Sequence, residues 1–495
     1  MMKRTLLALL MIPLLSPRTD ATWSIVMVDR RTREIAIGSV TCLTSFDLRA
    51  ITPVVLVERG GATVQAAGDF DGTRRPIIRA GFAAGTAPAA MLTTLAGVPG
   101  HQQRQYGIVD VLGNALTFTG SQASAWAGGL TGVDGDIDYA LQGNILAGPC
   151  VVPAMEAALL AGGDLPARLM AAMEAARATG GDGRCSCSPS AATACGCPPP
   201  SFAKSGHIGY LIVARAGDVD DPSCTAAGCA DGDYLMSLNV PFQTAASPDP
   251  VLQLASLYAS WRAERAGRPD AIRSSVSFTP SASDVTMTVS LFDIEGVAVL
   301  APVVALTVEH AAGSAGLALI GTALEIGGGN YTVALSTGPF DATDRFRITA
   351  DDGVRAIVLM PSSSYMHPSA SGFADCNGNG AFDYLDIAAA TSFDVDLDGV
   401  PDECRSFRRG DCNRDGQHDL ADAVFDLSAL FAGGAAPACL DACDTNDDGL
   451  RNLADAIYSL NALFALGSAP PRPFPTCGLD PTVDLLECVD AGSCP

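Results

Sequence analysis

The sequence has few of the residues and motifs on which common hydrolytic and metal-dependent enzymes rely. It contains five histidines in 495 residues, and they form no HExxH motif or other paired spacing suited to zinc. It also lacks the GxSxG turn that presents a nucleophilic serine, and it lacks a phosphate-binding glycine loop. These absences argue against zinc-dependent, serine-elbow and phosphate-loop chemistry.

Positive charge is also scarce. The formal net charge is −24, and residues 366–495 contain 22 Asp or Glu, 6 Arg and no Lys. No basic stripe is present that would replace the counterions of nucleic acid, so we expect no nucleic-acid partner. The acidic residues are concentrated in the C-terminal quarter, where divalent cations would neutralise them.

Long apolar runs are absent after the N-terminus. Residues 1–21 combine a basic start, the apolar core TLLALLMIPLL and a cleavage region that ends in Ala21, which is the pattern of a secretory signal peptide. No later run reaches 18 apolar residues, so we expect no membrane span. Sixteen cysteines, many in close pairs, are typical of an oxidising compartment. We therefore expect a secreted protein, extracellular or at the cell surface.

The hydrophobic pattern predicts an α+β chain of several domains. Residues 22–265 alternate β-rich runs with helical stretches, which favours two sheets with helical layers. VVLVERGGATVQAAG predicts two strands that turn at Gly60-Gly61. Residues 270–365 alternate apolar and polar residues between glycine-rich turns, so we expect an Ig-like β-sandwich there.

The cysteine cluster CSCSPSAATACGC at residues 185–197 has two interpretations. Its CxC pairs could hold a metal ion, or they could form disulfides that staple a surface insertion. In a secreted chain that also carries the Cys224/Cys229 pair, the disulfide interpretation is favoured.

Two copies of one loop pattern, residues 411–422 and 444–455, lie near the C-terminus. Oxygen-bearing side chains stand at positions 1, 3, 5, 9 and 12 of each loop, and Gly416 and Gly449 stand at position 6. Ca²⁺ needs six to eight oxygen ligands and the loop needs glycine at its sharp turn, so the pattern predicts two calcium sites. The predicted ligand positions are Asp411, Asn413, Asp415, Gln417, Asp419, Asp422, Asp444, Asn446, Asp448, Leu450, Asn452 and Asp455.

Each loop leads into a similar apolar stretch, and Asp replaces the usual Glu at position 12. The arrangement resembles the type I dockerin, a duplicated loop–helix module, over residues 408–467 of a C-terminal domain that we place at 408–495. The resemblance implies a cohesin-like partner or a cell-surface component, selected partly by Leu420-Ala421 and Leu453-Ala454. We expect the helical apolar residues mostly to form the core of the module, namely Val424, Phe425, Leu427, Leu430, Phe431, Ile457, Tyr458, Leu460, Leu463 and Phe464.

Residues 371–405 carry further loops of this kind and resemble thrombospondin type 3-like calcium repeats. Cys376 and Cys404 are candidates to close this segment. Its predicted calcium ligands are Asp375, Asn377, Asn379, Asp383, Asp386, Asp394, Asp396 and Asp398.

The predicted cleavage after Ala21 would make Thr22 the first residue of the mature chain. A threonine with a free α-amino group can activate its own hydroxyl, because the amine titrates near neutrality and accepts the hydroxyl proton. The alternative is that Thr simply follows a signal-peptidase site by chance. On spacing alone, the second interpretation is favoured.

The segments TWSIVMVDRRTREIAIGSV, RGGATVQAAG and DYALQGNILAGP, with others through residue 260, resemble the domain-of-unknown-function family 1028. The resemblance implies an N-terminal-nucleophile (Ntn) hydrolase αββα sandwich with Thr22 as nucleophile and as base through its amine. Gln142-Gly143-Asn144 are then candidate oxyanion donors, with Asn144 the foremost, and Asp182 is a candidate to orient the amine. Each could instead be structural. The chain departs from the family at Cys185-Ser186-Cys187, and it lacks a lysine that would assist the threonine.

Three functions follow from these features. The first is a secreted Ntn-type hydrolase of an amide or peptide-like bond, tethered by calcium-loaded modules. The second is a non-catalytic extracellular binding or structural protein. The third, an accessory role in polysaccharide degradation, is weaker because no pair of catalytic carboxylates is evident.

Overall fold

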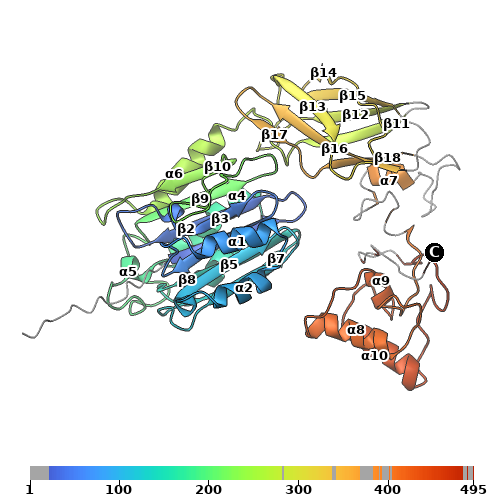
Figure 1. The fold of residues 1–495 in the computed structure, drawn as a ribbon, viewed down its shortest axis with the longest axis horizontal. Coiled ribbons are helices and arrows are strands. Elements are labelled where there is room, and N and C mark those ends of the chain that lie inside the picture. Colours follow the sequence, from blue (N-terminus) through green and yellow to red (C-terminus); the bar gives the residue numbers. More distant parts are fainter. Residues whose placement is uncertain are drawn as a thin grey trace, which may run out of the picture. The chain divides into compact units, whose positions relative to one another are not determined.

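The computed structural model describes residues 22–280, 284–336, 342–367, 383–388, 391–392, 401, 404–482, 486, 488 and 494 (Figure 1). The chain divides into two compact units, residues 1–268 with 356–361, and residues 269–355 with 362–495. Within the described ranges, no helix combines the length and apolar character needed to cross a membrane. The protein has a mixed α+β fold with several antiparallel sheets.

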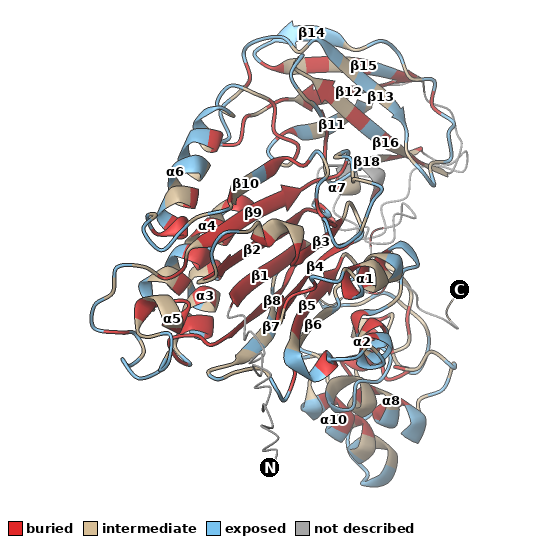
Figure 2. Ribbon diagram, turned by 60° about the vertical axis from the view of Figure 1, so that its left-hand side comes forward, coloured by how far each residue is buried: buried red, intermediate tan, exposed pale blue. Residues whose placement is uncertain are grey.

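The larger sheet of the first unit has six antiparallel strands in the order β10-β9-β2-β1-β8-β7. Its four central strands are buried along almost their whole length, because both faces of the sheet are covered (Figure 2). The strands are β1 (Thr22–Asp29), β2 (Ile35–Thr41), β7 (Gly128–Asp134), β8 (Ile137–Asn144), β9 (Ile208–Ala214) and β10 (Met236–Val240).

The second sheet of this unit has four antiparallel strands in chain order, β3 (Pro53–Leu56), β4 (Gly60–Ala66), β5 (Arg104–Asp110) and β6 (Ala115–Thr119). β5 and β6 pair as an antiparallel hairpin that turns at residues 111–114. The β3–β4 turn does not follow the prediction: Gly60 and Gly61 are the first two residues of β4, and the chain turns before them, where Glu58 has a positive φ of 60°. Gly60 is needed within the strand because a Cβ there would lie 2.5 Å from the Phe82 ring.

Helices cover the outer face of each sheet, and the two inner faces pack against each other. The six-stranded sheet is covered by α3 (Val151–Leu159), α4 (Leu165–Ala178) and α6 (Pro250–Ala263). The four-stranded sheet is covered by α1 (Arg74–Ala83) and α2 (Pro88–Ala96). The expected order of two sheets between helical layers is therefore observed.

Short helices and disulfides complete this unit. The helices are η1 (Leu48–Ala50), η2 (His101–Gln103) and α5 (Gly183–Ser186). The cysteine cluster is disulfide-bonded, as the disulfide interpretation predicted. Cys42–Cys185 ties it to the end of β2, Cys150–Cys197 ties it to the start of α3, and Cys187–Cys195 closes a loop within it. A further disulfide joins Cys224 and Cys229.

The second unit begins with two small antiparallel sheets. One has the order β11-β12-β15-β14, and in the other β16 pairs with β13, β17 and β18. Alternate residues such as Met287, Val333 and Phe346 are fully buried, which matches the predicted alternation. The strands are β11 (Ser275–Pro280), β12 (Asp284–Ser290), β13 (Ala305–His310), β14 (Leu324–Gly327), β15 (Asn330–Ser336), β16 (Ala342–Asp351), β17 (Ala356–Val358) and β18 (Ser363–His367).

The C-terminal part contains α7 (Asp383–Ala388), α8 (Leu420–Phe431), α9 (Leu440–Cys443) and α10 (Leu453–Phe464). The long helices α8 and α10 begin at the same position of each repeat and contact each other. Asp419 with Asp422, and Asn452 with Asp455, form capping boxes that fix where the helices begin. Cys412–Cys443 links the two repeats, and Cys439–Cys488 and Cys477–Cys494 hold the tail.

The expectation that apolar side chains of these helices mostly form a core is wrong for four of them. Val424, Phe431, Ile457 and Phe464 are exposed. The buried residues of this part of the chain are instead mostly small, polar or disulfide-bonded, because the acidic loops and disulfides occupy the interior. They include Phe407, Cys412, Asp422, Ala423, Asp426, Cys439, Ala442, Cys443, Asp455, Ala456 and Ser459.

Candidate functional site

Thr22 begins the central strand β1 at one end of the six-stranded sheet. In the strand register it lies between Thr41 of β2 and Asn144 of β8. Its side chain shares a face with Ser24 and Val26, which is the face turned toward the second sheet. Both sheets therefore surround Thr22, and only 3% of the residue is exposed.

The backbone of Thr22 is held by two side-chain amides. Its nitrogen donates to Asn144 Oδ1 over 3.2 Å. Its carbonyl accepts from Gln65 Nε2, a residue of the opposite sheet, over 2.9 Å. The structure thus brings together Thr22 and Asn144, two of the residues that the sequence singled out.

A buried polar network extends inward from Thr22 between the two sheets. Gln65 Nε2 also donates to Gln105 Oε1 over 2.8 Å, and Gln65 Oε1 accepts from the hydroxyl of Ser24. Ser24 Oγ lies 2.9 Å from Ser39 Oγ. Further along the same strands the interface is apolar, with Val26, Val28, Ile35, Ile37, Val55 and Val109 in one buried cluster. The inter-sheet layer is therefore polar at the Thr22 end and apolar beyond it.

Gln142 belongs to this network and does not face the Thr22 nitrogen. Its Oε1 accepts from Thr117 Oγ1 over 2.8 Å, and its Nε2 donates to Thr63 Oγ1 over 3.1 Å. Both ends of the amide are therefore used between the sheets. Of the predicted QGN residues, Asn144 is the one whose side chain contacts Thr22.

Asp182 is linked to Thr22 indirectly, through Arg184 and the strand partner Thr41. Its carboxylate accepts from the Cys42 N–H over 2.8 Å and from Arg184 Nη2 over 2.8 Å, and it caps α5 through the Arg184 N–H. Arg184 Nη2 in turn lies 3.5 Å from Thr41 Oγ1, and Thr41 is the strand partner of Thr22. Asp182 thus fixes Arg184 and the Thr41–Cys42 backbone beside the start of β1.

Gln65 and Gln105 are the functional candidates that sequence reasoning missed. Each sits in a strand whose other inward-facing residues are mostly apolar or small, and each is fully buried. A glutamine at an inward position of a buried strand needs hydrogen-bond partners, and that is the signal that could have identified them.

A cavity of about 430 Å³ adjoins Asp182. It is lined by Cys42, Arg184, Cys185, Pro189, Ala203, Lys204, His207 and Ala245. His207 Nε2 lies 3.3 Å from Cys185 Sγ, and burial followed by the charge of Lys204 lowers the pKa of His207. Cys42 and Cys185 are joined in a disulfide, so this cluster is not a thiolate metal site.

In the first C-terminal loop, two carboxylates accept hydrogen bonds from the backbone of the loop. Gly416 N donates to Asp411 Oδ2 over 2.9 Å, and the N–H groups of Asn413 and Asp419 donate to the two oxygens of Asp422. Burial, followed by the charges of Asp411 and Asp415, raises the pKa of Asp422 to about 6.

The second loop repeats this geometry. Gly449 N donates to Asp444 Oδ2 over 2.8 Å, and Asp455 accepts from the N–H groups of Asn446 and Asn452. Burial and the adjacent Asp444 raise the pKa of Asp455 to about 7. The buried Oδ1 of Asn446 has no hydrogen-bond partner within the described part of the chain. This donor set of close carboxylates and an amide oxygen fits a hard cation such as Ca²⁺.

The predicted ligands in the preceding acidic segment are only partly described. Asp383 and Asp386 lie on α7 and are buried. The others fall outside the described residues, as does Cys376, and they are Asp375, Asn377, Asn379, Asp394, Asp396 and Asp398.

Comparison with known proteins finds a similarity over part of the first unit. Residues 22–195 match the family model described as a family of unknown function, DUF1028. A crystal structure of a Silicibacter pomeroyi protein of that family is similar at 20% identity and a TM-score of 0.34, covering 48% of this chain and 88% of the other. FdeC, an Escherichia coli adhesin, is similar at 10% identity and a TM-score of 0.15, covering 72% and 65%. No curated protein matches the chain. The similarity to DUF1028 is thus limited to residues 22–195.

Proposed function

We propose that residues 22–268 form an Ntn-type hydrolase of an amide or peptide-like bond, with Thr22 as its nucleophile. The observation that carries this proposal is the position of the Thr22 nitrogen, 3.2 Å from Asn144 Oδ1 at the polar end of the inter-sheet layer. The two sheets between helical layers are compatible with the Ntn αββα sandwich.

The chemistry would begin once residues 1–21 are removed and the Thr22 nitrogen becomes an amine. Thr22 Oγ1 attacks the amide carbonyl carbon of the substrate while the amine takes the hydroxyl proton. The C–N bond then breaks, the ammonium returns that proton to the leaving nitrogen, and an ester remains on Oγ1. Water, deprotonated by the same amine, hydrolyses the ester and releases the acid.

Asn144 and Gln65 would act by positioning. Asn144 Oδ1 accepts from the Thr22 nitrogen, which leaves the nitrogen lone pair for the hydroxyl proton. Gln65 fixes the Thr22 carbonyl, so the first residue of the mature chain would not fray from the sheet end. Asp182 and Arg184 would hold the neighbouring Thr41–Cys42 segment and one wall of the adjacent cavity.

A β-lactone probe tests the nucleophile without knowledge of the substrate, since ring opening by a hydroxyl leaves a stable ester. Mass spectrometry of the mature protein should locate the added mass on Thr22. Thr22→Ser should retain labelling, whereas Thr22→Ala and a chain with one extra residue before Thr22 should not be labelled. Equal labelling of the extended chain, or none of the wild type with a free Thr22, contradicts the proposal.

We further propose that the C-terminal repeats bind two Ca²⁺ ions and dock the protein onto a cohesin-like partner. The residues that would hold the ions are the loop positions predicted from the sequence, and bound Ca²⁺ would neutralise their mutual repulsion. The supporting observation is a set of exposed apolar residues repeated at equivalent positions of α8 and α10. The pairs are Leu420 and Leu453 (50% and 48% exposed), Val424 and Ile457 (56% and 50%), and Phe431 and Phe464 (67% and 68%).

Equivalent exposed residues on two helices would give the partner two related faces. Replacing Leu420 and Val424 by Asp should leave binding to an immobilised cohesin-like domain largely intact, because the α10 face remains. Replacing Leu453 and Ile457 as well should abolish it. Loss of binding from the first pair alone would contradict a dual-face module.

A further inference from the structure

A group of buried hydrogen-bond donors with excess positive charge lies on the outer side of the four-stranded sheet. Arg74 is the first residue of α1, His101 belongs to η2, and Arg104 and Tyr106 belong to β5. Arg104 and Tyr106 alternate with Gln105, so they face the side opposite to the inter-sheet network of Thr22. This group is therefore separate from the candidate catalytic residues.

The group is buried and well ordered by packing. Arg74 is 1% exposed, Tyr106 is fully buried and His101 is 8% exposed. The His101 ring stacks on Phe118 with centroids 4.3 Å apart, and Tyr106 stacks beside both. Arg104 is partly exposed, so one side of the group reaches solvent.

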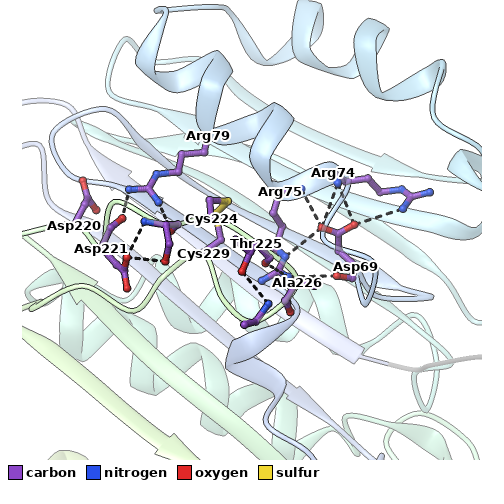
Figure 3. The surroundings of a disulfide bond; sticks show 12 residues. Asp69, Arg74, Arg75, Arg79, Asp220, Asp221, Cys224, Thr225, Ala226 and Cys229 are labelled. Carbon is purple, nitrogen blue, oxygen red and sulfur yellow. Dashed lines mark hydrogen bonds and ion pairs between the residues drawn. A yellow bond between two sulfur atoms is a disulfide. The ribbon is translucent and has the colours of Figure 1, made fainter.

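Asp69 accounts for only part of the positive charge. The side chains of Arg74 and Arg75 diverge from the start of α1, Arg75 toward Thr225 and Ala226 and Arg74 away from them (Figure 3). Asp69 accepts from Arg75 Nε over 3.2 Å and from Arg74 Nη1 over 3.4 Å. Arg75 also donates to the carbonyls of Ala50 and Thr225.

Arg104 adds a third guanidinium beside the first two. A Cβ on Gly100 would lie 3.6 Å from Arg74 Nη2 and 3.8 Å from Arg104 Nη1, so both guanidiniums border the same small space. Burial, followed by the charge of Arg74, lowers the pKa of Arg104. The carboxylates of this cluster are Asp69 and the largely exposed Asp71, so three cations face two anions.

Several donors of the group have no acceptor among the residues that the structure describes. They are Arg74 Nε, Arg104 Nε and Arg104 Nη1, and His101 Nδ1 is likewise without a partner, whereas the Tyr106 hydroxyl interacts with the Arg74 side chain. Burial raises the pKa of Tyr106, which keeps its hydroxyl as a donor. Buried donors without partners are costly, and an anion with several oxygens would satisfy them together.

We propose that Arg74, His101, Arg104 and Tyr106 bind one small oxyanion, either a free phosphate or sulfate or the carboxylate of an organic acid. Guanidinium groups suit this ligand class because their planar N–H groups match the oxygens of phosphate and carboxylate. The glycine at position 100 adds no side chain of its own to the space beside both guanidiniums, which Gln103 Oε1 also borders, 3.5 Å from where a Cβ would lie. The proposal does not depend on catalysis by Thr22.

Isothermal titration calorimetry on the full mature chain, with calcium and ionic strength held constant by chloride, tests the site. Inorganic phosphate, sulfate and acetate are titrated separately, so their relative affinities distinguish a tetrahedral oxyanion from a carboxylate. We expect saturable binding of at least one with a stoichiometry of one, and about tenfold or more weaker binding in Arg104→Gln. Arg79→Gln is the matched control on α1, because Arg79 binds the carbonyls of Asp221 and Ser223 instead.

The thermal stability of the same variants separates a ligand site from a structural cluster. Without added oxyanion, Arg104→Gln should melt at or above the wild-type temperature, since it removes repulsion from Arg74. A ligand that raises the wild-type melting temperature should raise that of Arg79→Gln equally and that of Arg104→Gln much less. No saturable binding of any probe, or binding that Arg104→Gln leaves unchanged, overturns the proposal. A clearly lower melting temperature of Arg104→Gln without oxyanion also overturns it.

Discussion

At the start of β1, one side-chain oxygen lies where a newly released amine would need a partner. Asn144 Oδ1 is 3.2 Å from the Thr22 nitrogen, and Gln65 holds the carbonyl of the same residue from the other sheet. Two amides from different sheets thus fix one residue. Holding one residue in this way reduces the conformational freedom of the chain. Catalytic sites commonly hold residues in this way, because the reacting groups must keep a fixed geometry.

A different residue, Asp344, should determine how the two small sheets within residues 275–367 respond to acid. It is fully buried and accepts from the Ala318 N–H over 2.6 Å and from Ser314 Oγ over 2.9 Å, and it lies 2.9 Å from His367 Nε2. Burial opposes ionisation, but these hydrogen bonds outweigh it and lower the pKa of Asp344 from 3.8 to about 2.

The lowered pKa predicts a defined pH window. The native state holds the proton of Asp344 less tightly than the unfolded state, so this carboxylate stabilises the fold above about pH 4. That contribution, about 2 kcal/mol, is lost as the pH falls from 4 to 2. Calorimetry of the wild type should show that the melting temperature of these two sheets falls as the pH is lowered from 4 to 2.

Asp344→Asn is the variant that isolates this effect. The melting temperature of the same two sheets should be lower in this variant than in the wild type at neutral pH. It should also change less between pH 4 and pH 2. Parallel acid dependence of the wild type and the variant would show that Asp344 is not the group that titrates.

The sequence predicted single functional residues where a local pattern included them. It did not predict residues whose role depends only on contacts between distant strands. Thr22 and Asn144 stood out through the cleavage point and the QGN motif, and the structure places them in contact. Gln65 could not be assigned because its partners come from two other strands: Ser24 and the Thr22 carbonyl belong to β1, and Gln105 belongs to β5. Nothing in local spacing shows that these strands face each other.

At the level of elements, the local sequence pattern predicted where strands and helices occur. It predicted less well where each element begins and ends. The helices α3 and α4, the second of which has Pro166 in its first turn, and the strand alternation around Met287 follow the periodicity of the sequence. The Gly60-Gly61 pair was read as a turn, but the close approach of the Phe82 ring requires Gly60 inside the strand. On α8 and α10, helical periodicity suggested a core, whereas the interior of the repeats is occupied by disulfides and acidic loops.

The insertion between α4 and β9 should depend unequally on its disulfides. Cys42–Cys185 closes a separation of 143 residues, and Cys187–Cys195 closes one of 8. Loop-closure entropy favours the longer link, so replacing Cys42 and Cys185 by Ser should lower the free energy of unfolding by about 2–5 kcal/mol. The same change at Cys187 and Cys195 should cost less.

Denaturant unfolding of the two double-serine variants compares these costs directly. The short link is a matched control, because it lies in the same insertion and removes the same number of cysteines. An equal or larger loss from Cys187→Ser with Cys195→Ser would show that the long link does not anchor the domain.

At the scale of the whole molecule, calcium should act on the C-terminal repeats and not on the first unit. The acidic groups of each loop lie close together, and without a cation their repulsion opposes folding. Excess chelator should therefore unfold the repeats, across residues 375–465, while residues 22–268 stay folded. Hydrogen-exchange mass spectrometry with and without chelator resolves the two regions.

Two results would count against this division. Unchanged exchange in α8 and α10 after chelation would contradict calcium-dependent folding of the repeats. Increased exchange in β1 and β8 would show that the first unit also needs the ion. A double variant, Asp411→Asn with Asp444→Asn, should reproduce the effect of chelator on the repeats.

The most direct test of the account is the identity of the first residue of the mature protein. Intact mass and N-terminal peptide sequencing of protein purified from the secreting cells should show a free α-amino group on Thr22. A mature chain that begins at any other residue, or whose Thr22 amine is blocked, would contradict the proposed nucleophile.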